Sequence, residues 1–351
     1  MVKKIKYRTA MTKCAHIVYI PFSGVGLHGG FRGNTWYSHR IEIFKKYTLR
    51  SLANQSNKNF LLWITFRPEE EKNPLTSKIA EAIEEAGISY VFTFNGLMYW
   101  DDKFTNYTLK TKIRNSLMML WDCWVYKEWK SPIQLLKLSW ENKNKSLLER
   151  LSQSLQTLKE AIGSDFEWIY LTRIDSDDMF HKHTIDLIQS EKPKQRQALI
   201  FDKGYVYNIV TGQLGTWNPP TNPPFHTIIF WGNDFFDARR HLSYYQNFKS
   251  HEDIPRIFNA KTLDINSYMV SFHGKHISTG WESPLPRYIY QKIKYLPYCY
   301  TMSGRNISTR WKSRARKVRN FMIGEEIQEP EKSQILKDFG IDISQIRENI
   351  V

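Results

Sequence analysis

The alternation of apolar strands with helical periodicity in the first 95 residues constrains the fold most. The runs AHIVYIPF at 15–22 and FLLWITF at 60–66 are typical of buried strands, and 89–94 predicts a third strand. Apolar side chains recur at helical spacing through 37–52, and 74–86 predicts a further helix. Strands separated by helices form right-handed βαβ units, so the sequence predicts an α/β fold whose mostly parallel sheet is flanked by helices.

The second half of the chain continues this pattern less regularly. Six apolar residues form one helical stripe at 147–162, and the strand WIYLTRI follows at 168–174. Short strands are predicted at 198–201 and 205–209. The segment WNPPTNPPF at 217–225 is rich in Pro and Asn and predicts a loop.

The chain divides into a large domain with an appendage at each end. We predict a basic N-terminal segment at 1–14, one α/β domain at 15–300 and a basic, then acidic, C-terminal extension at 301–351. Residues 108–163 look helical throughout and are predicted to be a helical insertion in the domain. An apolar share of 41% is ample for a large core and excludes a wholly disordered chain.

Positive charge is concentrated near the two ends of the chain. The formal net charge is +15, of which residues 1–13 supply five basic and no acidic side chains and residues 301–323 supply seven basic and none acidic. Such clusters attract anionic lipid, nucleic acid or a phosphate-bearing substrate. A solvated helix face is an equally weighted alternative.

Membrane spans and disulfides are not expected. The longest apolar runs fall far short of the roughly 20 residues that span a bilayer, and the N-terminus lacks the pattern of a signal peptide. Cys14, Cys123 and Cys299 lie far apart and form no C-x-x-C pair, which argues against a disulfide framework or a zinc ribbon. These features predict a cytoplasmic location, with peripheral contact at the inner face of the membrane left open.

The main chemical signal is a cluster of carboxylates at the end of the strand at 168–174. The cluster is Asp175, Ser176, Asp177 and Asp178. A bare D-x-D is expected roughly once by chance in such a chain, but open α/β sheets bind ligands at the carboxyl ends of their strands. Crowded carboxylates are stable as anions when a hard cation binds them, so Asp175, Asp177 and Asp178 are predicted ligands of Mn²⁺ or Mg²⁺. The alternative is that these aspartates are surface residues that cap the helix predicted to follow them.

A second acidic group, His251-Glu252-Asp253, precedes Pro255. Adjacent acids before a proline are ordinary turn chemistry. In an enzyme that moves a sugar from a diphosphate, however, one carboxylate must take the proton of the attacking hydroxyl, and Asp253 or Glu252 is the candidate base.

Further candidates could contact the metal or the phosphates of a donor. His273 could complete the metal sphere, although a lone histidine is more often structural. Lys275, Arg114 and Arg173, which precedes the acidic cluster, are candidates for the donor nucleotide. For Arg114, a plain surface position is equally weighted.

The glycine-rich segment GVGLHGGFRG follows the first strand and contains G-x-G-x-x-G at 24–29. A dinucleotide fingerprint requires a helix to begin inside the motif, whereas Phe31, Arg32 and Asn34 make a poor helix start. We therefore favour a flexible loop over the base of a nucleotide.

The order of several short motifs resembles the rhamnosyltransferase family, which is similar to metal-dependent glycosyltransferases of the GT-A fold. The resemblance covers roughly residues 15 to 281, although 100–163 and the basic tail have no clear counterpart. The motifs that carry it are HRIEIF at 39–44 with TLRSL at 48–52 and Gln55, RIDSDD at 173–178, GYVY at 204–207, Pro224-Phe225, HEDIP at 251–255, and His273-Gly274 with IST at 277–279.

The resemblance implies a GT-A-like, Rossmann-type sheet, a nucleotide-sugar donor, a divalent metal at Asp175 and Asp177, and a base in the pair Glu252-Asp253. The expected reaction moves a sugar, with rhamnose or another deoxyhexose as the candidate, from a nucleoside diphosphate to a hydroxyl of a glycan or lipid-linked glycan. Aromatic side chains such as Phe225 and Trp231 are candidates to stack on sugar rings. Whether the reaction inverts or retains the anomeric centre is left open.

Two other classes of function compete with this interpretation. A metal-dependent nuclease or phosphatase would use the basic ends to hold a polyanion, although no nucleic-acid partner is expected. A noncatalytic relative of the transferase fold would bind glycan or an anionic membrane. The basic stretch at 310–319, which contains Trp311, is the candidate for membrane contact.

Overall fold

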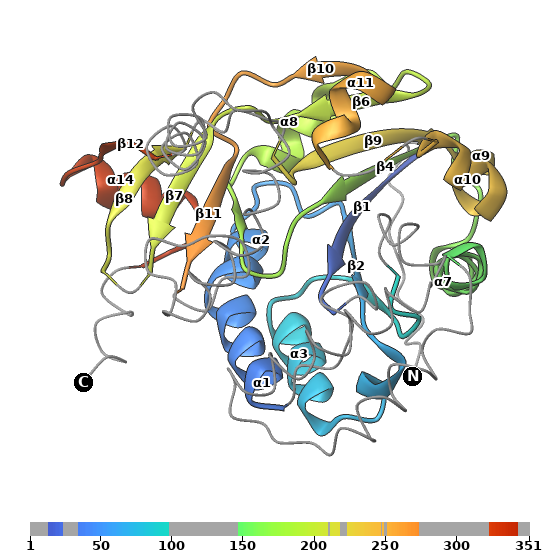
Figure 1. Cartoon of the computed structure of the whole chain (residues 1–351), viewed down its shortest axis with the longest axis horizontal. Coiled ribbons are helices and arrows are strands. Elements are labelled where there is room, and N and C mark those ends of the chain that lie inside the picture. The colour runs from blue at the N-terminus through green and yellow to red at the C-terminus, as the bar shows by residue number, and fades with distance from the viewer. Residues whose placement is uncertain are drawn as a thin grey trace, which may run out of the picture.

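A computed structural model describes residues 13–23, 34–97, 147–209, 211–217, 223–246, 248, 251–273 and 323–342 (Figure 1). Side chains are described for these residues except Glu252 and residues 323–325. Within them, the chain forms an α/β structure built around a mixed, mostly parallel sheet flanked by helices, as predicted.

The larger sheet has seven strands among the described residues, in the order β10-β6-β9-β4-β1-β2-β3. Neighbours β3, β2, β1 and β4 run parallel, β9 is antiparallel to β4 and β6, and β10 is parallel to β6. The strands are β1 (Cys14–Pro21), β2 (Leu61–Thr65), β3 (Tyr90–Thr93), β4 (Trp168–Arg173), β6 (Gln197–Ile200), β9 (His226–Trp231) and β10 (Asn259–Thr262).

Helices cover both faces of this sheet because its central strands are apolar on both sides. In β1, Val18 and Ile20 join the core on one face, whereas Ile17 and Tyr19 join the core on the other. Such continuous burial is typical of parallel strands. The first face packs against α1 (Asn34–Ile43), the π-helical segment η1 (Phe44–Thr48), α2 (Leu49–Ala53), α3 (Pro74–Glu85) and α8 (Thr184–Ser190). The second packs against α7 (Leu147–Ile162), α9 (Gly232–Phe236), α10 (Ala238–Tyr244) and α11 (Ile254–Ile257).

A second sheet lies beside the first, on the side of α1 and α2 (Figure 1). Its order is β12-β8-β7-β11-β5, and its strands are β5 (Met179–Phe180), β7 (Gly204–Asn208), β8 (Leu214–Trp217), β11 (Tyr268–Phe272) and β12 (Ile323–Glu326). Only five residues separate β4 of the first sheet from β5 of the second. The acidic cluster therefore lies where the chain passes from one sheet to the other.

Part of the predicted C-terminal extension belongs to this second sheet. β12 pairs with the edge strand β8. Leu336 of α14 (Glu331–Asp338) and Phe339, which directly follows the helix, are buried in a core shared with Tyr207 and Met269. The expectation of an appendage is thus corrected for residues 323–342, because their apolar residues complete the cover of a sheet. The basic stretch before them, 301–322, lies outside the described residues.

Other sequence predictions have a clear outcome. The helix predicted at 147–162 is confirmed as α7. It packs on the second face of the larger sheet. The rest of the predicted insertion lies outside the described residues, as do the segment 24–33, Arg114 and Lys275. In the part of the chain that the structure describes, no helix is both long enough and apolar enough to cross a bilayer.

Candidate functional site

The acidic cluster lies at the carboxyl edge of the parallel strands. Strands β1 and β4 are neighbours at the centre of the sheet, and the backbone N–H of Ile174 donates to the carbonyl of Tyr19 (3.1 Å), which extends their pairing by one residue. The chain then turns, with the N–H of Asp178 donating to the carbonyl of Asp175 (3.2 Å). Ile174 is fully buried and anchors this turn in the core. This edge is where open α/β sheets bind ligands.

Asp175 is the carboxylate of the cluster with the largest solvent contact. About a third of its side chain is exposed (34%), against 7% for Asp177. Its Oδ1 accepts a hydrogen bond from Nη2 of the buried Arg173 (2.7 Å), and Nη1 of Arg173 donates to the carbonyl of Pro224 (3.1 Å). Arg173 therefore links the acidic turn, through hydrogen bonds, to the segment that precedes β9.

Asp177 is buried between two donors from distant parts of the chain. Its Oδ2 forms an ion pair with Nη1 of Arg40 on α1 and lies 3.1 Å from Nε2 of His273, which follows β11. The ring of His39 lies 5.7 Å from that of His273. Three separate segments thus meet at one carboxylate oxygen.

Asp178 has a structural environment. It is buried, and its Oδ1 accepts a hydrogen bond from the backbone N–H of Ser271 in β11 (3.1 Å), which joins the turn to the second sheet. Burial raises the pKa of Asp178 well above its usual range, and the negative charges of Asp177 and Asp175 raise it further. Burial and the neighbouring carboxylates thus both disfavour the charged form of Asp178.

The segment with the predicted base approaches the same edge through a buried histidine. His226 begins β9 and is paired in register with Arg173. Burial lowers the pKa of His226 well below its usual range, and the positive charges of Arg173 and His251 lower it further. His251 opens the short turn η3 (His251–Asp253), which continues into α11 through the buried Ile254.

Asp253 is held at the start of α11 by an ion pair. Its Oδ1 lies 2.9 Å from Nη2 of Arg256, and 19% of its side chain is exposed. The side chain of Glu252 lies outside the described part of the structure. Asp253 therefore has solvent contact and a fixed position, the minimum for a general base.

The carboxylates of the acidic turn offer the oxygen donors that a hard divalent ion prefers. Within the described residues, no group of three or more His, Cys, Asp or Glu side chains is placed to hold a metal ion. Mg²⁺ is usually held by one or two carboxylates together with substrate phosphates. Asp175 fits that smaller requirement through its partly exposed carboxylate, whereas Asp177 is buried and paired with Arg40 and His273. His273 and Asp178 are committed to Asp177 and to the Ser271 amide, so their predicted role as ligands has no geometric support.

Two aromatic residues that were expected to stack on sugar rings lie away from the acidic turn or inside the core. Phe225 is fully buried and stacks on Tyr268 at a centroid distance of 4.2 Å, so it belongs to the core. Trp231 is 47% exposed, but it ends the antiparallel strand β9 opposite Trp168, at the other edge of the sheet from Asp175. The position of Phe225 therefore gives its predicted stacking no support, and Trp231 lies far from the acidic turn because β9 runs antiparallel to β4.

Two sets of polar residues near the carboxyl ends of the parallel strands were not predicted from the sequence. Arg40 stands in the HRIEIF motif, but no charge pattern connects it to a residue 137 positions away. The second group is formed by Ser23 after β1 and by Arg67 and Glu70 after β2, where Ser23 Oγ and the Arg67 N–H both donate to Glu70 Oε2. Glu70 is the middle one of three consecutive Glu residues before Lys72, and nothing in that run of like charges distinguishes it, although it is 1% exposed.

Comparison with known proteins adds no assignment. No protein-family model matches the chain, and no curated protein matches it. The resemblance of its motifs to rhamnosyltransferases therefore stays a prediction.

Proposed function

We propose that this chain is a glycosyltransferase that moves a sugar from a nucleoside diphosphate to a hydroxyl of a glycan or lipid-linked glycan. The observation that carries the proposal is the position of Asp175: a partly exposed carboxylate, hydrogen-bonded to Arg173, at the carboxyl edge of a parallel sheet. The strand order, with β9 antiparallel between β4 and β6, is compatible with the GT-A-like fold that we propose for the domain.

The donor diphosphate is proposed to lie along this edge. Arg173 is the cation nearest to the exposed carboxylate and is oriented by the Pro224 carbonyl. Mn²⁺ or Mg²⁺, when bound by Asp175, would neutralise charge on the leaving nucleoside diphosphate. Arg114 and Lys275 remain candidates for the donor on the sequence pattern alone.

The acceptor step is assigned to Asp253 for a reaction that inverts the anomeric centre. The acceptor oxygen forms a bond to the anomeric carbon, the bond from that carbon to the phosphate oxygen breaks, and the acceptor proton passes to the Asp253 carboxylate. What supports this role is the partial exposure of the Asp253 carboxylate and its place at the start of α11. In a retaining reaction Asp253 has no such task.

The test is release of nucleoside diphosphate from a panel of sugar nucleotides, with product mass as the second readout. We expect Asp175→Asn and Asp253→Asn each to lower kcat by about 10²- to 10⁴-fold, the range for loss of a positioned acid-base or charge-stabilising group. The matched control is Asp264→Asn, since its carboxylate is 78% exposed and pairs only with Lys203 on the surface.

Thermal shift separates binding from turnover. A nucleoside diphosphate that binds the folded chain should raise Tm, and more so with Mn²⁺. Absence of any shift and of any sugar transfer across the panel would reject the proposal. Phosphate release from a polyanion without a sugar donor would favour a hydrolase instead.

A further inference from the structure

We propose that Asp177 is a positioning residue: through Arg40 and His273 it fastens the acidic turn to α1 and to the end of β11, and so holds Asp175 in place at the edge of the sheet. The contacts of Asp177 with Arg40 and His273 are called the turn lock below. This role replaces that of a metal ligand, which the sequence predicted for Asp177. The effect of the turn lock on sugar transfer rests on the proposed function, whereas its effect on the turn does not.

The Asp177 carboxylate is occupied by two donors of the protein itself. Its Oδ2 forms an ion pair with Nη1 of Arg40, and each of these side chains is only 7% exposed. Nε2 of His273, whose side chain is 3% exposed, lies 3.1 Å from the same oxygen. In so buried a position the ion pair is screened little by water or salt, and removal of one partner leaves an uncompensated charge.

Arg40 is itself held in place by its helix. Its guanidinium carbon lies 5.5 Å from the ring centroid of Trp36, one turn earlier on α1, within the range of a cation–π contact. Tyr37 and Ile41 of the same helix belong to the core on the first face of the larger sheet. The ion pair therefore ties the acidic turn to a helix that is packed on that sheet.

Two successive aspartates extend the contact between β5 and β11. The antiparallel pairing of β5 with β11 ends at Met179. Before that residue, Oδ1 of Asp178 accepts a hydrogen bond from the backbone N–H of Ser271 (3.1 Å), and Asp177 contacts His273 two residues further along. The acidic turn is thus joined to the end of the second sheet by side chains where the strand pairing stops.

Asp175 lies between the two fixed ends of this turn. Before it, the N–H of Ile174 donates to the carbonyl of Tyr19 in β1, and after it the N–H of Asp178 donates to the Asp175 carbonyl. Asp177 fixes the second end. A displacement of about 1 Å at a reacting group can lower a rate by about 10²-fold, so loss of the turn lock should affect the reaction through Asp175.

The test removes both charges of the ion pair together, in the double variant Arg40→Met/Asp177→Leu. Replacement of a buried ion pair by apolar residues of similar volume often costs little stability, so Tm should stay close to that of the wild type. The amides of Asp178 and Ser271, which donate hydrogen bonds within and to the turn, should exchange their hydrogens on the order of tenfold faster.

Kinetics separates a positioning residue from a merely structural one. The double variant should lower kcat for sugar transfer by about 10²-fold. KM for the sugar nucleotide should stay within about twofold, because Arg40 and Asp177 act through Asp175 and not on the donor. The control Lys261→Gln/Glu191→Gln removes an ion pair between the edge strand β10 and the segment after α8, and should change neither kcat nor the exchange at the turn.

If the double variant does not fold, His273→Leu decides. It keeps the ion pair between Arg40 and Asp177 and removes only the contact with the end of β11. The amides of Asp178 and Ser271 should again exchange faster, by a smaller factor than with the ion pair removed, and kcat should fall with KM unchanged.

Wild-type exchange at Asp178 and Ser271 in the deciding variant overturns the inference, as does faster exchange with a wild-type kcat. A fall in kcat accompanied by a comparable rise in KM also overturns it, since Asp177 would then be a structural residue of the whole site. Failure of the proposed function is a different result: the wild type turns over no sugar nucleotide, and the turn lock is then judged by hydrogen exchange alone.

Discussion

Glu70 illustrates how the environment of a single residue changes its chemistry. Although Ser23 Oγ and the Arg67 N–H donate to its carboxylate and the positive charge of Arg67 favours ionisation, burial is the larger effect and raises the pKa of Glu70 from 4.5 to about 7. The folded state thus binds the proton more tightly than the unfolded state. The contribution of Glu70 to the free energy of unfolding is therefore complete below about pH 4.5 and is lost as the pH rises to about 7.

Glu70→Gln should therefore flatten the pH dependence of stability. Between pH 5 and pH 8, the wild type should lose about 1 to 3 kcal/mol more unfolding free energy than Glu70→Gln, since each pH unit of unequal protonation corresponds to at most about 1.4 kcal/mol. Urea denaturation at several pH values measures this difference. The exposed neighbour Glu71→Gln should keep the wild-type slope; equal slopes for all three proteins would contradict the role of Glu70.

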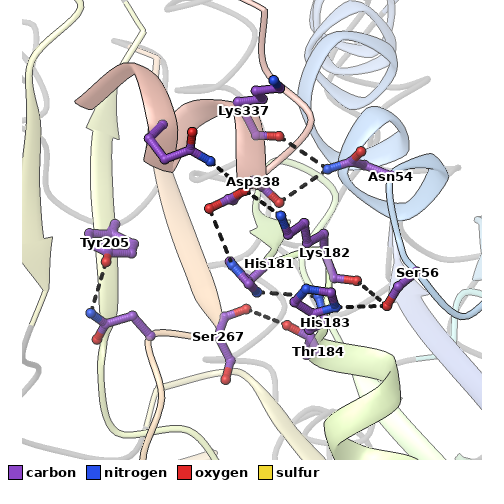
Figure 2. A network of polar contacts seen from close by, with 12 residues as sticks. Asn54, Ser56, His181, Lys182, His183, Thr184, Tyr205, Ser267, Lys337 and Asp338 are labelled. Carbon is purple, nitrogen blue, oxygen red and sulfur yellow. Dashed lines mark hydrogen bonds and ion pairs between the residues drawn. The ribbon is translucent and has the colours of Figure 1, made fainter. Parts of the chain in front are cut away.

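At the scale of the element, α14 shows how a short helix with a polar surface becomes part of a core. Its end is closed by Gly340, whose φ of +76° suits glycine, with the N–H of Gly340 donating to the Lys337 carbonyl (3.0 Å) and that of Ile341 to the Leu336 carbonyl (2.9 Å). Figure 2 shows that Asp338 and the Lys337 backbone then meet His181, Lys182 and Asn54.

The apolar side of α14 should dominate its stabilising effect. Phe339→Ala should lower the free energy of unfolding by about 3 to 5 kcal/mol, because it removes a fully buried ring that contacts His181 and Tyr205. Lys337→Ala, at an exposed position of the same helix, should change stability by less than about 0.5 kcal/mol. Chemical denaturation followed by circular dichroism provides the measurement, and similar losses for both variants would show that the helix does not dock through Phe339.

The polar side of α14 should contribute less. The Lys182 Nζ to Asp338 Oδ1 ion pair is 2.8 Å long but partly exposed, and such pairs contribute about 0 to 1 kcal/mol. We expect Asp338→Asn to lower the free energy of unfolding by about 0 to 1 kcal/mol. This loss should disappear at high salt, because salt screens exposed charges. A loss of several kcal/mol, measured by the same denaturation, would show that the network in Figure 2 is a main anchor of the segment.

At the scale of the whole molecule, two sheets meet at the acidic turn, while the net charge of +15 comes mainly from the two basic segments. The two properties have separate physical origins: the turn is placed by strand pairing, whereas the membrane contact predicted for the basic stretch at 310–319 would depend on long-range attraction. The proposed contact with an anionic membrane therefore should not depend on Asp175 or Asp177.

Replacement of the six basic residues between 310 and 319 by Gln should weaken cosedimentation with phosphatidylserine vesicles. Binding by the wild type should fall steeply between low and physiological salt, as the Debye length shortens from about 30 Å at 0.01 M to about 8 Å. Neutral phosphatidylcholine vesicles are the control. Unchanged sedimentation of the variant would dismiss this segment as the membrane contact.

Much of the element pattern could be predicted because it depends on local periodicity. Apolar spacing located α3, α7 and the strands β1, β2 and β4 to within a few residues. Helical spacing was also predicted through 37–52, but its π-helical segment was not. The core-facing residues from Tyr37 to Leu52 are spaced four, three, four and four residues apart. This average is slightly above the 3.6-residue period of an α-helix and is the signal that could have indicated a wider turn.

By itself, the sequence determined the strands β1 to β4, β6 and β7, the helices α3 and α7, and the carboxylate cluster at the end of a buried strand, since these depend on residues close together in the chain. Only the tertiary structure decided that Arg40, Asp177 and His273 share one oxygen, that Asp178 is structural, and that residues 323–342 complete the second sheet. Those contacts join segments more than 90 residues apart. Their partners are selected by strand order and helix packing, which no local period encodes.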